Sequence, residues 1–68
     1  MRLSARNQLK GKIVEVRKGT TTAHVRVNIG GHVITAAITN EAVDDLKLAA
    51  GKDAYVVIKA SDVMIATD

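Results

Sequence analysis

The sequence predicts an all-β domain with one small helix. Two observations predict it. Segments rich in β-branched residues alternate in polarity and are separated by glycines, and a segment between the third and fourth of these has apolar residues at helical spacing. The resulting order, β-β-β-α-β-β, is that of a five-stranded, OB-fold-like barrel. SH3-like barrels and other small β-domains have a similar length, so the order of the elements favours this fold without excluding the others.

The first expected strand covers residues 9–17. Apolar residues and lysines alternate up to Ile13, but Val14 and Val16 fall on the opposite parity. Successive side chains of a strand point to opposite faces, so either both faces are covered here or a β-bulge shifts the register. A turn is expected next, at residues 18–21.

The second expected strand, residues 22–29, has the clearest pattern in the sequence. Its odd-numbered positions are apolar and its even-numbered positions are polar, which places the apolar side chains on one face. Gly30 and Gly31 follow, and two glycines tolerate the positive φ angles of a tight hairpin turn. The return strand, residues 32–38, is apolar on both faces, so we expect both faces to be covered, one of them by another subunit.

A short helix is expected after the third strand. Apolar residues there stand at helical spacing, at Ala42, Val43 and Leu46. Thr39 or Asn40 is a suitable N-cap, because a side-chain oxygen at that position accepts a hydrogen bond from a free N–H group of the first turn. Residues 54–59 and 63–66 are the fourth and fifth expected strands, and residues 60–62 connect them.

The length of 68 residues allows one domain, residues 1–68, with a core of small aliphatic side chains. The chain has one tyrosine and no phenylalanine, tryptophan or cysteine. Domains of this size usually need a disulfide, a structural metal or a partner subunit for stability. Disulfides are excluded, and two histidines without any thiolate argue against structural zinc. The composition therefore predicts an oligomer.

Nothing in the sequence predicts a signal peptide or a membrane span. The N-terminal segment carries Arg2 and Arg6 without an apolar run after them, and no apolar stretch approaches the ~20 residues that a span requires. We therefore expect a cytoplasmic protein without a membrane partner. The formal net charge of +3 is a mild preference for anions and is also ordinary for a soluble domain.

No residues stand at the spacing of a known catalytic or metal-binding motif, so we do not expect an enzyme. Asp44 and Asp45 are adjacent on the expected helix and face different ways, as on a solvated surface. His24 falls on the polar face of its strand and His32 lies at a turn. Neither histidine has a partner ligand in the sequence.

A module that binds single-stranded nucleic acid is the main alternative function, because OB-folds often bind such strands. That binding depends on aromatic side chains that stack on bases, together with a basic groove. Tyr55 is the only aromatic residue, so the chain has no stacking platform. We do not expect nucleic acid as a partner.

Three segments could instead bind a tetrahedral anion. Ser4 and Arg6 lie on the same side of an extended segment. Lys59 and Ser61 offer an ammonium, a hydroxyl and free N–H groups at a strand end, and Thr39 offers a hydroxyl beside a helix N-terminus. A buried dianion needs many donors and compensation of its charge. Each residue alone is equally explained as a surface residue or a helix cap.

The sequence resembles molbindins, the molybdenum-pterin-binding (Mop) proteins, whose domain also occurs in molybdate-responsive regulators and in ATPase subunits of molybdate transporters. The opening motif is Ser4-Ala5-Arg6-Asn7-Gln8-Leu9-Lys10-Gly11. The middle motif is Ala37-Ile38-Thr39 with Ala42-Val43 and Leu46. The closing motif is Gly51-Lys52, Val57-Ile58-Lys59-Ala60-Ser61 and Asp62-Val63-Met64-Ile65-Ala66. The resemblance covers essentially the whole chain.

The resemblance implies a single Mop domain that binds molybdate or tungstate in the cytoplasm, for storage or homeostasis. It also implies a homohexamer, a trimer of dimers, with oxyanions bound between subunits. The implied oxyanion-binding residues are Ser4, Ala5, Arg6, Thr39, Ala42, Lys59, Ala60 and Ser61. Arg6 and Lys59 would come from different subunits, and Ala5 would contribute backbone contacts. Ala42 stands where some members have serine, so one hydroxyl donor is missing or replaced.

The family also has a second class of site near a threefold axis, which no motif places in this sequence. The expected turn supplies weak candidates for it, namely Lys18, Gly19, Thr20 and Thr21. A chain with one tyrosine gives no support for binding of a pterin ring. Molybdate and tungstate are nearly isosteric, so these residues do not distinguish them.

Overall fold

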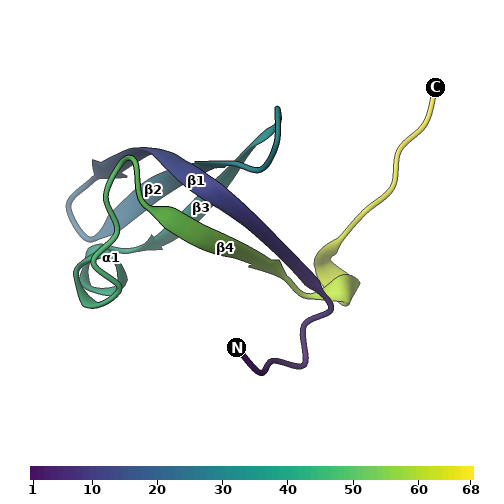
Figure 1. Ribbon diagram of the computed structural model, residues 1–68, viewed down its shortest axis with the longest axis horizontal. Coiled ribbons are helices and arrows are strands. Elements are labelled where there is room, and N and C mark those ends of the chain that lie inside the picture. The colour runs from purple at the N-terminus through teal and green to yellow at the C-terminus, as the bar shows by residue number, and fades with distance from the viewer.

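The computed structural model describes residues 1–68 and contains four strands, one α-helix and one 3-10 helix (Figure 1). In chain order the elements are β1 (Asn7–Lys18), β2 (Thr22–Asn28), β3 (Val33–Thr39), α1 (Asn40–Asp45), β4 (Asp53–Ile58) and η1 (Ala60–Asp62). The four strands and α1 follow the order expected for the first four strands and the helix. No helix in the structure is both long and apolar enough to cross a membrane.

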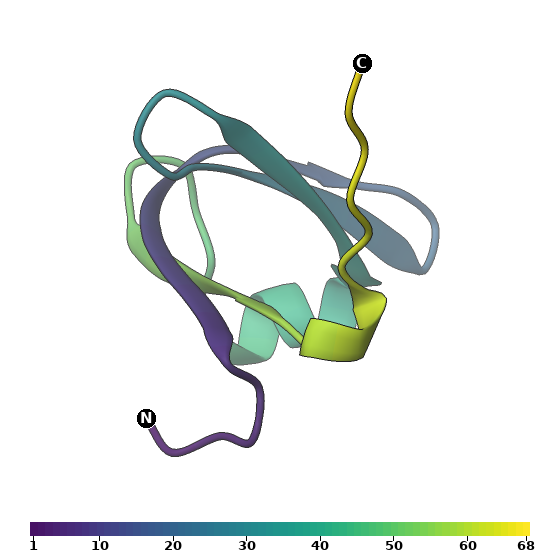
Figure 2. The same cartoon turned by 90° about the vertical axis from the view of Figure 1, so that its right-hand side faces the viewer.

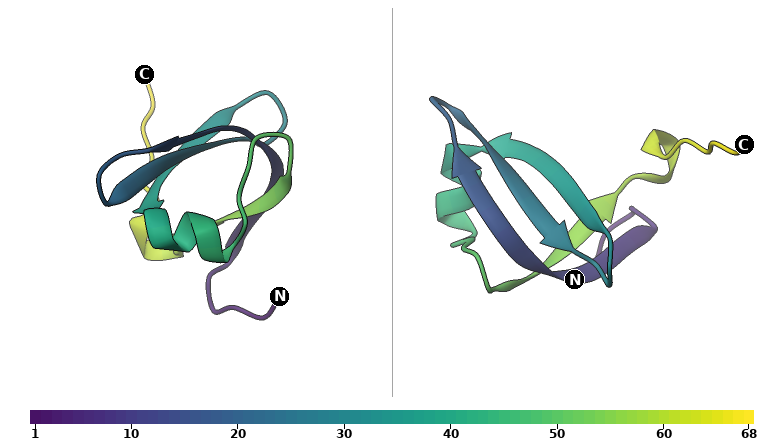
Figure 3. Two further views of the ribbon diagram at one scale, coloured as in Figure 1. Left: turned by 90° about the vertical axis from the view of Figure 1, so that its left-hand side faces the viewer. Right: turned by 90° about the horizontal axis from the view of Figure 1, so that it is seen from above.

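The four strands form one antiparallel sheet in the order β3-β2-β1-β4, so β3 and β4 are its edges. β1 joins the two halves, because its first half pairs with β4 and its second half pairs with β2. The sheet curls into a half-barrel, with α1 beneath its concave side (Figures 2 and 3). This curled sheet is the OB-like architecture that the sequence predicts.

A β-bulge at Val14 produces the change of parity in β1. Ile13 pairs with Val27 and Glu15 pairs with Arg26, so Val14 is an extra residue between two consecutive pairs. The Val14 side chain is 46% exposed, while Ile13 is fully buried. The bulge explanation is therefore confirmed, and it increases the local twist that curls the sheet.

The core lies on the concave side of the half-barrel and consists of small aliphatic side chains. The buried residues are Ile13, Ala23, Val25, Val27, Val43 and Val56. Strand β2 supplies three of them at alternate positions, as its polarity pattern predicts. α1 contributes only Val43, because it ends at Asp45 after six residues.

Leu46, which stands at helical spacing with Ala42 and Val43, does not pack against the core. The next residue, Lys47, has a φ of 54°, so the chain turns away directly after the helix. Leu46 is 67% exposed, and Leu48 packs against the core instead. In a helix this short, the apolar residues at both ends cannot all face the core.

The hairpin between β2 and β3 has the geometry that its glycines predict. Gly30 and Gly31 have φ angles of 99° and 101°. Both of their N–H groups donate to the side-chain oxygen of Asn28, at 3.0 and 2.9 Å. An L side chain would be strained at either position, because these φ values favour glycine.

The fifth strand expected at residues 63–66 is absent, which corrects the predicted strand count from five to four. After β4 the chain forms η1 and then runs out as an extended tail, residues 63–68, away from the sheet (Figures 1 and 3). Strand residues need a backbone partner, and no residue after 63 has a backbone hydrogen bond to the rest of the chain. Within one chain the half-barrel therefore remains open between β3 and β4.

Candidate functional site

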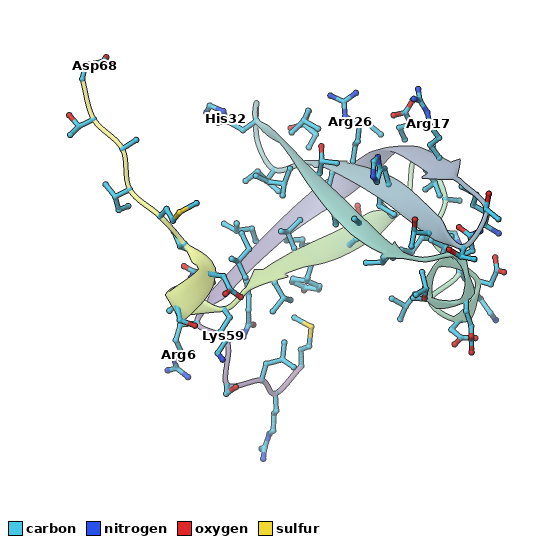
Figure 4. The ribbon with its side chains drawn as sticks, turned by 180° about the vertical axis from the view of Figure 1, so that it is seen from behind. Arg6, Arg17, Arg26, His32, Lys59 and Asp68 are labelled. Carbon is cyan, nitrogen blue, oxygen red and sulfur yellow. The ribbon has the colours of Figure 1, made fainter.

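Two cations predicted to bind an anion lie beside each other at one end of the sheet. Asn7, the first residue of β1, pairs with Ile58, the last residue of β4. The side-chain amide of Asn7 also donates to the Ile58 carbonyl oxygen at 3.2 Å. Arg6 and Lys59 are the residues that directly flank this pair, and both lie at this end of the molecule (Figure 4).

Neither cation has a carboxylate partner within the chain. The four ion pairs of the structure use other cations, namely Lys12, Arg17, Lys18 and Arg26. Arg6 and Lys59 are exposed. Arg6 and Lys59 flank one cross-strand pair, so this end of the sheet carries two uncompensated positive charges, which attract an anion.

The turn after β4 adds donors next to Lys59. Lys59 is the N-cap of η1 and its side chain makes no capping hydrogen bond. The turn is closed by the N–H of Asp62, which donates to the Lys59 carbonyl at 2.9 Å, while the N–H groups of Ala60 and Ser61 donate to no protein acceptor. The hydroxyl of Ser61 is likewise free of partners and exposed. These groups could all donate to one anion.

The segment before β1 is held close to the strand by one hydrogen bond. The Gln8 side-chain amide donates to the Ala5 carbonyl oxygen at 2.9 Å, and Ala5 is partly buried. Ser4 is exposed on this segment. The structure thus brings together five expected site residues at one end of the sheet, with Ser4 next to them along the chain. The five are Ala5, Arg6, Lys59, Ala60 and Ser61.

The other two expected residues, Thr39 and Ala42, lie at the opposite end. Thr39 pairs with Thr22, beside the last residues of β1, and α1 and η1 occupy opposite ends of the molecule (Figure 1). Thr39 is the N-cap of α1, and its Oγ1 accepts a hydrogen bond from the Ala42 N–H at 3.0 Å. That N–H is therefore not free for a ligand. One chain alone does not bring all eight residues together.

The turn that contains the second-site candidates is hydrogen-bonded to α1. Asn40 donates from its side-chain amide to the carbonyl oxygens of Gly19 and Thr20, at 3.0 and 3.4 Å. Its main-chain N–H donates to the Thr21 carbonyl at 2.9 Å. Lys18 forms an ion pair with Asp44 of α1 at 2.5 Å, so its charge is already compensated.

A shallow cavity of about 200 Å³ lies beside this turn. Its lining residues are Arg17, Lys18, Gly19, Thr22 and His24. Arg17 and His24, which sequence reasoning did not include, are paired across β1 and β2. Both stand on the polar parity of their strands, and only the strand register shows that they are neighbours.

Comparison with known proteins relates the whole chain to one family. A family model described as TOBE domain matches residues 3–65. A probable molybdenum-pterin-binding protein of Haemophilus influenzae is 45% identical over 69 residues, which cover 100% of both chains. The relatives that match over nearly their whole length are named as binding proteins and not as enzymes, in agreement with the expectation that this chain is not an enzyme.

Two solved structures share both the fold and substantial identity. A molybdate-binding protein from Sporomusa ovata has a TM-score of 0.94 and 33% identity, with 98% of this chain and 100% of that chain covered. The cytoplasmic molybdate-binding protein ModG, solved with molybdate bound, has a TM-score of 0.90 and 45% identity, with 94% and 46% covered. With residues 3–65 matched and a relative 45% identical over its full length, the chain belongs to the TOBE domain family, alongside the molybdenum-pterin-binding proteins.

Proposed function

We propose that this protein binds molybdate through Arg6 and Lys59, as a cytoplasmic store or buffer of the oxyanion. The observation that carries the proposal is the pair of cations without carboxylate partners, which flank the hydrogen-bonded ends of β1 and β4. Relatives that are named for binding molybdate or molybdenum-pterin support the identity of the anion.

The chemistry of the cluster suits a tetrahedral dianion. Such an anion has two negative charges, which one guanidinium and one ammonium neutralise. Its four oxygens accept several hydrogen bonds, and the hydroxyls of Ser4 and Ser61 with the N–H groups of Ala60 and Ser61 are available donors. Hydrogen bonds to a charged group contribute about 1.5–3 kcal/mol each, more than those between neutral groups.

We propose further that each site is completed by a second copy of the chain. Thr39 and Ala42 lie at the far end of the sheet from Arg6, so a site that contains all eight residues needs two chains. Since Arg6 and Lys59 flank paired strand ends of one chain, that chain could supply both charges and a second chain the Thr39 hydroxyl. The exposed apolar residues support association, and we propose a hexamer built as a trimer of dimers of single-domain chains.

Tungstate belongs to the same proposal, because it is nearly isosteric with molybdate and carries the same charge. The cavity beside the β1–β2 turn is proposed as a second, weaker anion site. Of the second-site candidates, Lys18 and Gly19 line this cavity together with Arg17, Thr22 and His24, while Thr20 and Thr21 lie in the adjoining turn. The Lys18–Asp44 ion pair lowers the positive charge there, which is why we rank this site below the first. Tyr55 alone gives no basis for a pterin ring or for stacked bases.

Native mass spectrometry combined with titration calorimetry tests the proposal. The full-length protein is measured without anion and with molybdate, tungstate or sulfate at equal concentration. We expect a hexamer that takes up about one molybdate or tungstate per chain, with sulfate binding at least about tenfold more weakly. A protein that binds none of the three, or that binds sulfate as tightly as molybdate, would contradict the proposed function.

A further inference from the structure

Asn7 and Gln8 are two neighbouring side-chain amides at the start of β1, and neither belongs to the proposed anion-binding residues. Each makes one hydrogen bond, which ends on a main-chain carbonyl oxygen. The amide of Asn7 donates to Ile58 at 3.2 Å, and the amide of Gln8 donates to Ala5 at 2.9 Å. Successive residues of a strand point to opposite faces, so the two amides reach two different segments. Both bonds are additional to the main-chain ladder of the sheet.

Both accepting carbonyl groups directly precede a cation of the proposed site. The Ala5 carbonyl shares its peptide group with the N–H of Arg6, and the Ile58 carbonyl shares its peptide group with the N–H of Lys59. Because a peptide group is planar and rigid, a hydrogen bond to its oxygen restrains the orientation of the whole group. Each amide therefore restrains the main chain at the point where it enters one cationic residue.

Arg6 and Lys59 lie just outside the strands, where the main-chain ladder no longer holds them (Figure 4). Residues 1–6 form no hydrogen bond between main-chain groups, and the bond from Gln8 is the only hydrogen bond that this segment makes. On the other side, the chain after β4 is next held by the N–H of Asp62, which donates to the Lys59 carbonyl at 2.9 Å. The two amides thus supply restraints that the ladder does not provide.

We propose that Gln8 and Asn7 are positioning residues of the anion site, with Gln8 orienting Arg6 and Asn7 orienting Lys59. This role rests on the proposed function, because it concerns the same two cations. Binding an anion with mobile groups costs affinity, since those groups lose conformational freedom when the anion is bound. Peptide groups that are already oriented in the free protein lower that cost. Both bonds act within one chain, so they orient the cations whichever copies of the chain complete each site.

The chemistry of an amide suits this role. An amide donates to a carbonyl oxygen and carries no charge, whereas an ionised carboxylate has no donor to offer. A carboxylate at position 7 or 8 would also attract the neighbouring cations and compete with the anion for them. Asn7 and Gln8 restrain the chain without compensating its charge, which agrees with the absence of a carboxylate partner for Arg6 and Lys59.

Main-chain order parameters from NMR relaxation of the anion-free protein test the restraint directly. We expect values near those of rigid backbone, about 0.85, in the wild type, and a fall to below about 0.6 at residues 4–6 in Gln8→Ala and at residues 59–61 in Asn7→Ala. Each variant should leave the other segment unchanged. The matched control is Asn28→Ala, which removes an amide that bonds only the β2–β3 hairpin and should affect neither segment. Wild-type order in both segments of the two variants would overturn the proposal.

Titration calorimetry with molybdate is the second measurement. Gln8→Ala and Asn7→Ala should each bind molybdate about three- to tenfold more weakly than the wild type, the range expected for loss of one neutral hydrogen bond. In a double-mutant cycle, Gln8→Ala should have no further effect once Arg6 is replaced by alanine, but its full effect when Lys59 is replaced. If Gln8 only stabilised the fold, the same loss would occur in every background, and that result would overturn its positioning role.

Failure of the proposed function gives a different result from failure of the positioning role. A wild type that binds no molybdate contradicts the proposed site, while the order parameters, which are measured without anion, still show whether the amides hold the two segments. A wild type that binds molybdate no more tightly than Gln8→Ala and Asn7→Ala contradicts the positioning role alone.

Discussion

The side-chain amide of Asn7 donates to the main-chain carbonyl oxygen of Ile58 at 3.2 Å, across 51 positions of the sequence. This bond closes the paired ends of β1 and β4 at the place where the chain leaves the sheet on both sides. The residues just outside the pair are Arg6 and Lys59. Their positions therefore depend on the register of the sheet rather than on mobile termini.

Arg6→Ala and Lys59→Ala should each weaken molybdate binding by at least about tenfold, which corresponds to ~1.4 kcal/mol. Each variant removes one charged hydrogen-bond donor and leaves half of the dianion's charge uncompensated. Isothermal titration with molybdate measures the loss.

Arg2→Ala and Lys10→Ala are the matched controls, since they remove the same charges at exposed positions outside the proposed site. They should bind molybdate within a factor of about two of the wild type, because charges screened by solvent contribute little. Unchanged affinity in both Arg6→Ala and Lys59→Ala would contradict the site. A uniform loss in all four variants would instead indicate a general effect of net charge.

Thr39→Ala should lower the stability of the fold and weaken binding less than either charge variant. The Thr39 Oγ1 caps α1 by accepting from the Ala42 N–H at 3.0 Å, and loss of such a cap costs about 0.5–2 kcal/mol. A neutral hydroxyl contributes only about 0.5–1.5 kcal/mol to a bound ligand. Thermal unfolding and titration measure the two effects. Thr35→Ala, at an exposed position of the same strand, should change neither.

Much of the fold could be predicted from the sequence because its signals are local. The polarity of β2 alternates without a break, and its odd-numbered residues are buried as that pattern requires. The change of parity after Ile13 indicated the bulge. Helical spacing does not show where a helix ends: α1 ends at Asp45, Leu46 is its C-cap, and the positive φ of Lys47 follows. Residues 63–66 have the composition of a strand, but they pair with no strand of the same chain.

The candidate site was less accessible to sequence reasoning. Periodicity places Arg6 before one strand and Lys59 after another, but it does not give the register that brings Asn7 beside Ile58. Donor chemistry alone made Arg6, Lys59 and Thr39 candidates for binding an anion, and the resemblance to molbindins assigned them to one site. The same resemblance grouped Thr39 with them, although one chain keeps Thr39 at the opposite end of the sheet. Arg17 and His24 were missed for the same reason, since only their pairing across two strands makes them neighbours.

Gly11→Ala should destabilise the protein strongly. A Cβ atom at this position would lie 2.4 Å from the main-chain oxygen of Asn28 and 2.8 Å from Cγ1 of Val27. The oxygen belongs to the backbone of β2 and cannot move aside without disturbing the sheet. Overpacking of this kind costs about 1–3 kcal/mol. Chemical denaturation measures the loss against Lys10→Ala at the exposed neighbouring position, and equal stability of the two variants would contradict the close packing.

Asn40→Asp should destabilise the protein more than Asn40→Ala at neutral pH. Alanine removes the bonds from the side-chain amide to the Gly19 and Thr20 carbonyls, at about 0.5–1.5 kcal/mol each. Aspartate removes the same donors and places a negative charge against two carbonyl oxygens. Its favourable interaction with the helix N-terminus, about 0.3–1 kcal/mol, does not offset that repulsion. Denaturation midpoints show which of the two variants is less stable. A more stable aspartate variant would show that the attraction of the carboxylate to the helix N-terminus exceeds its repulsion by the two carbonyl oxygens.

Molybdate should raise the melting temperature of the wild type by roughly 10 °C or more at a free concentration of 100 times its Kd. A ligand that binds only the folded protein stabilises it by RT ln(1 + [L]/Kd), which is about 2.7 kcal/mol per site at that concentration. In a domain of this size each 1 kcal/mol shifts the melting temperature by about 4–8 °C.

If Arg6→Ala weakens binding tenfold, the same molybdate concentration is only about 10 times its Kd and the stabilisation falls to about 1.4 kcal/mol. The thermal shift of Arg6→Ala should therefore be about half that of the wild type, while Arg2→Ala keeps the full shift. Differential scanning calorimetry at one protein concentration makes the comparison, because the stability of an oligomer depends on the concentration of its chains. A full shift in Arg6→Ala would mean that the guanidinium does not contact the anion.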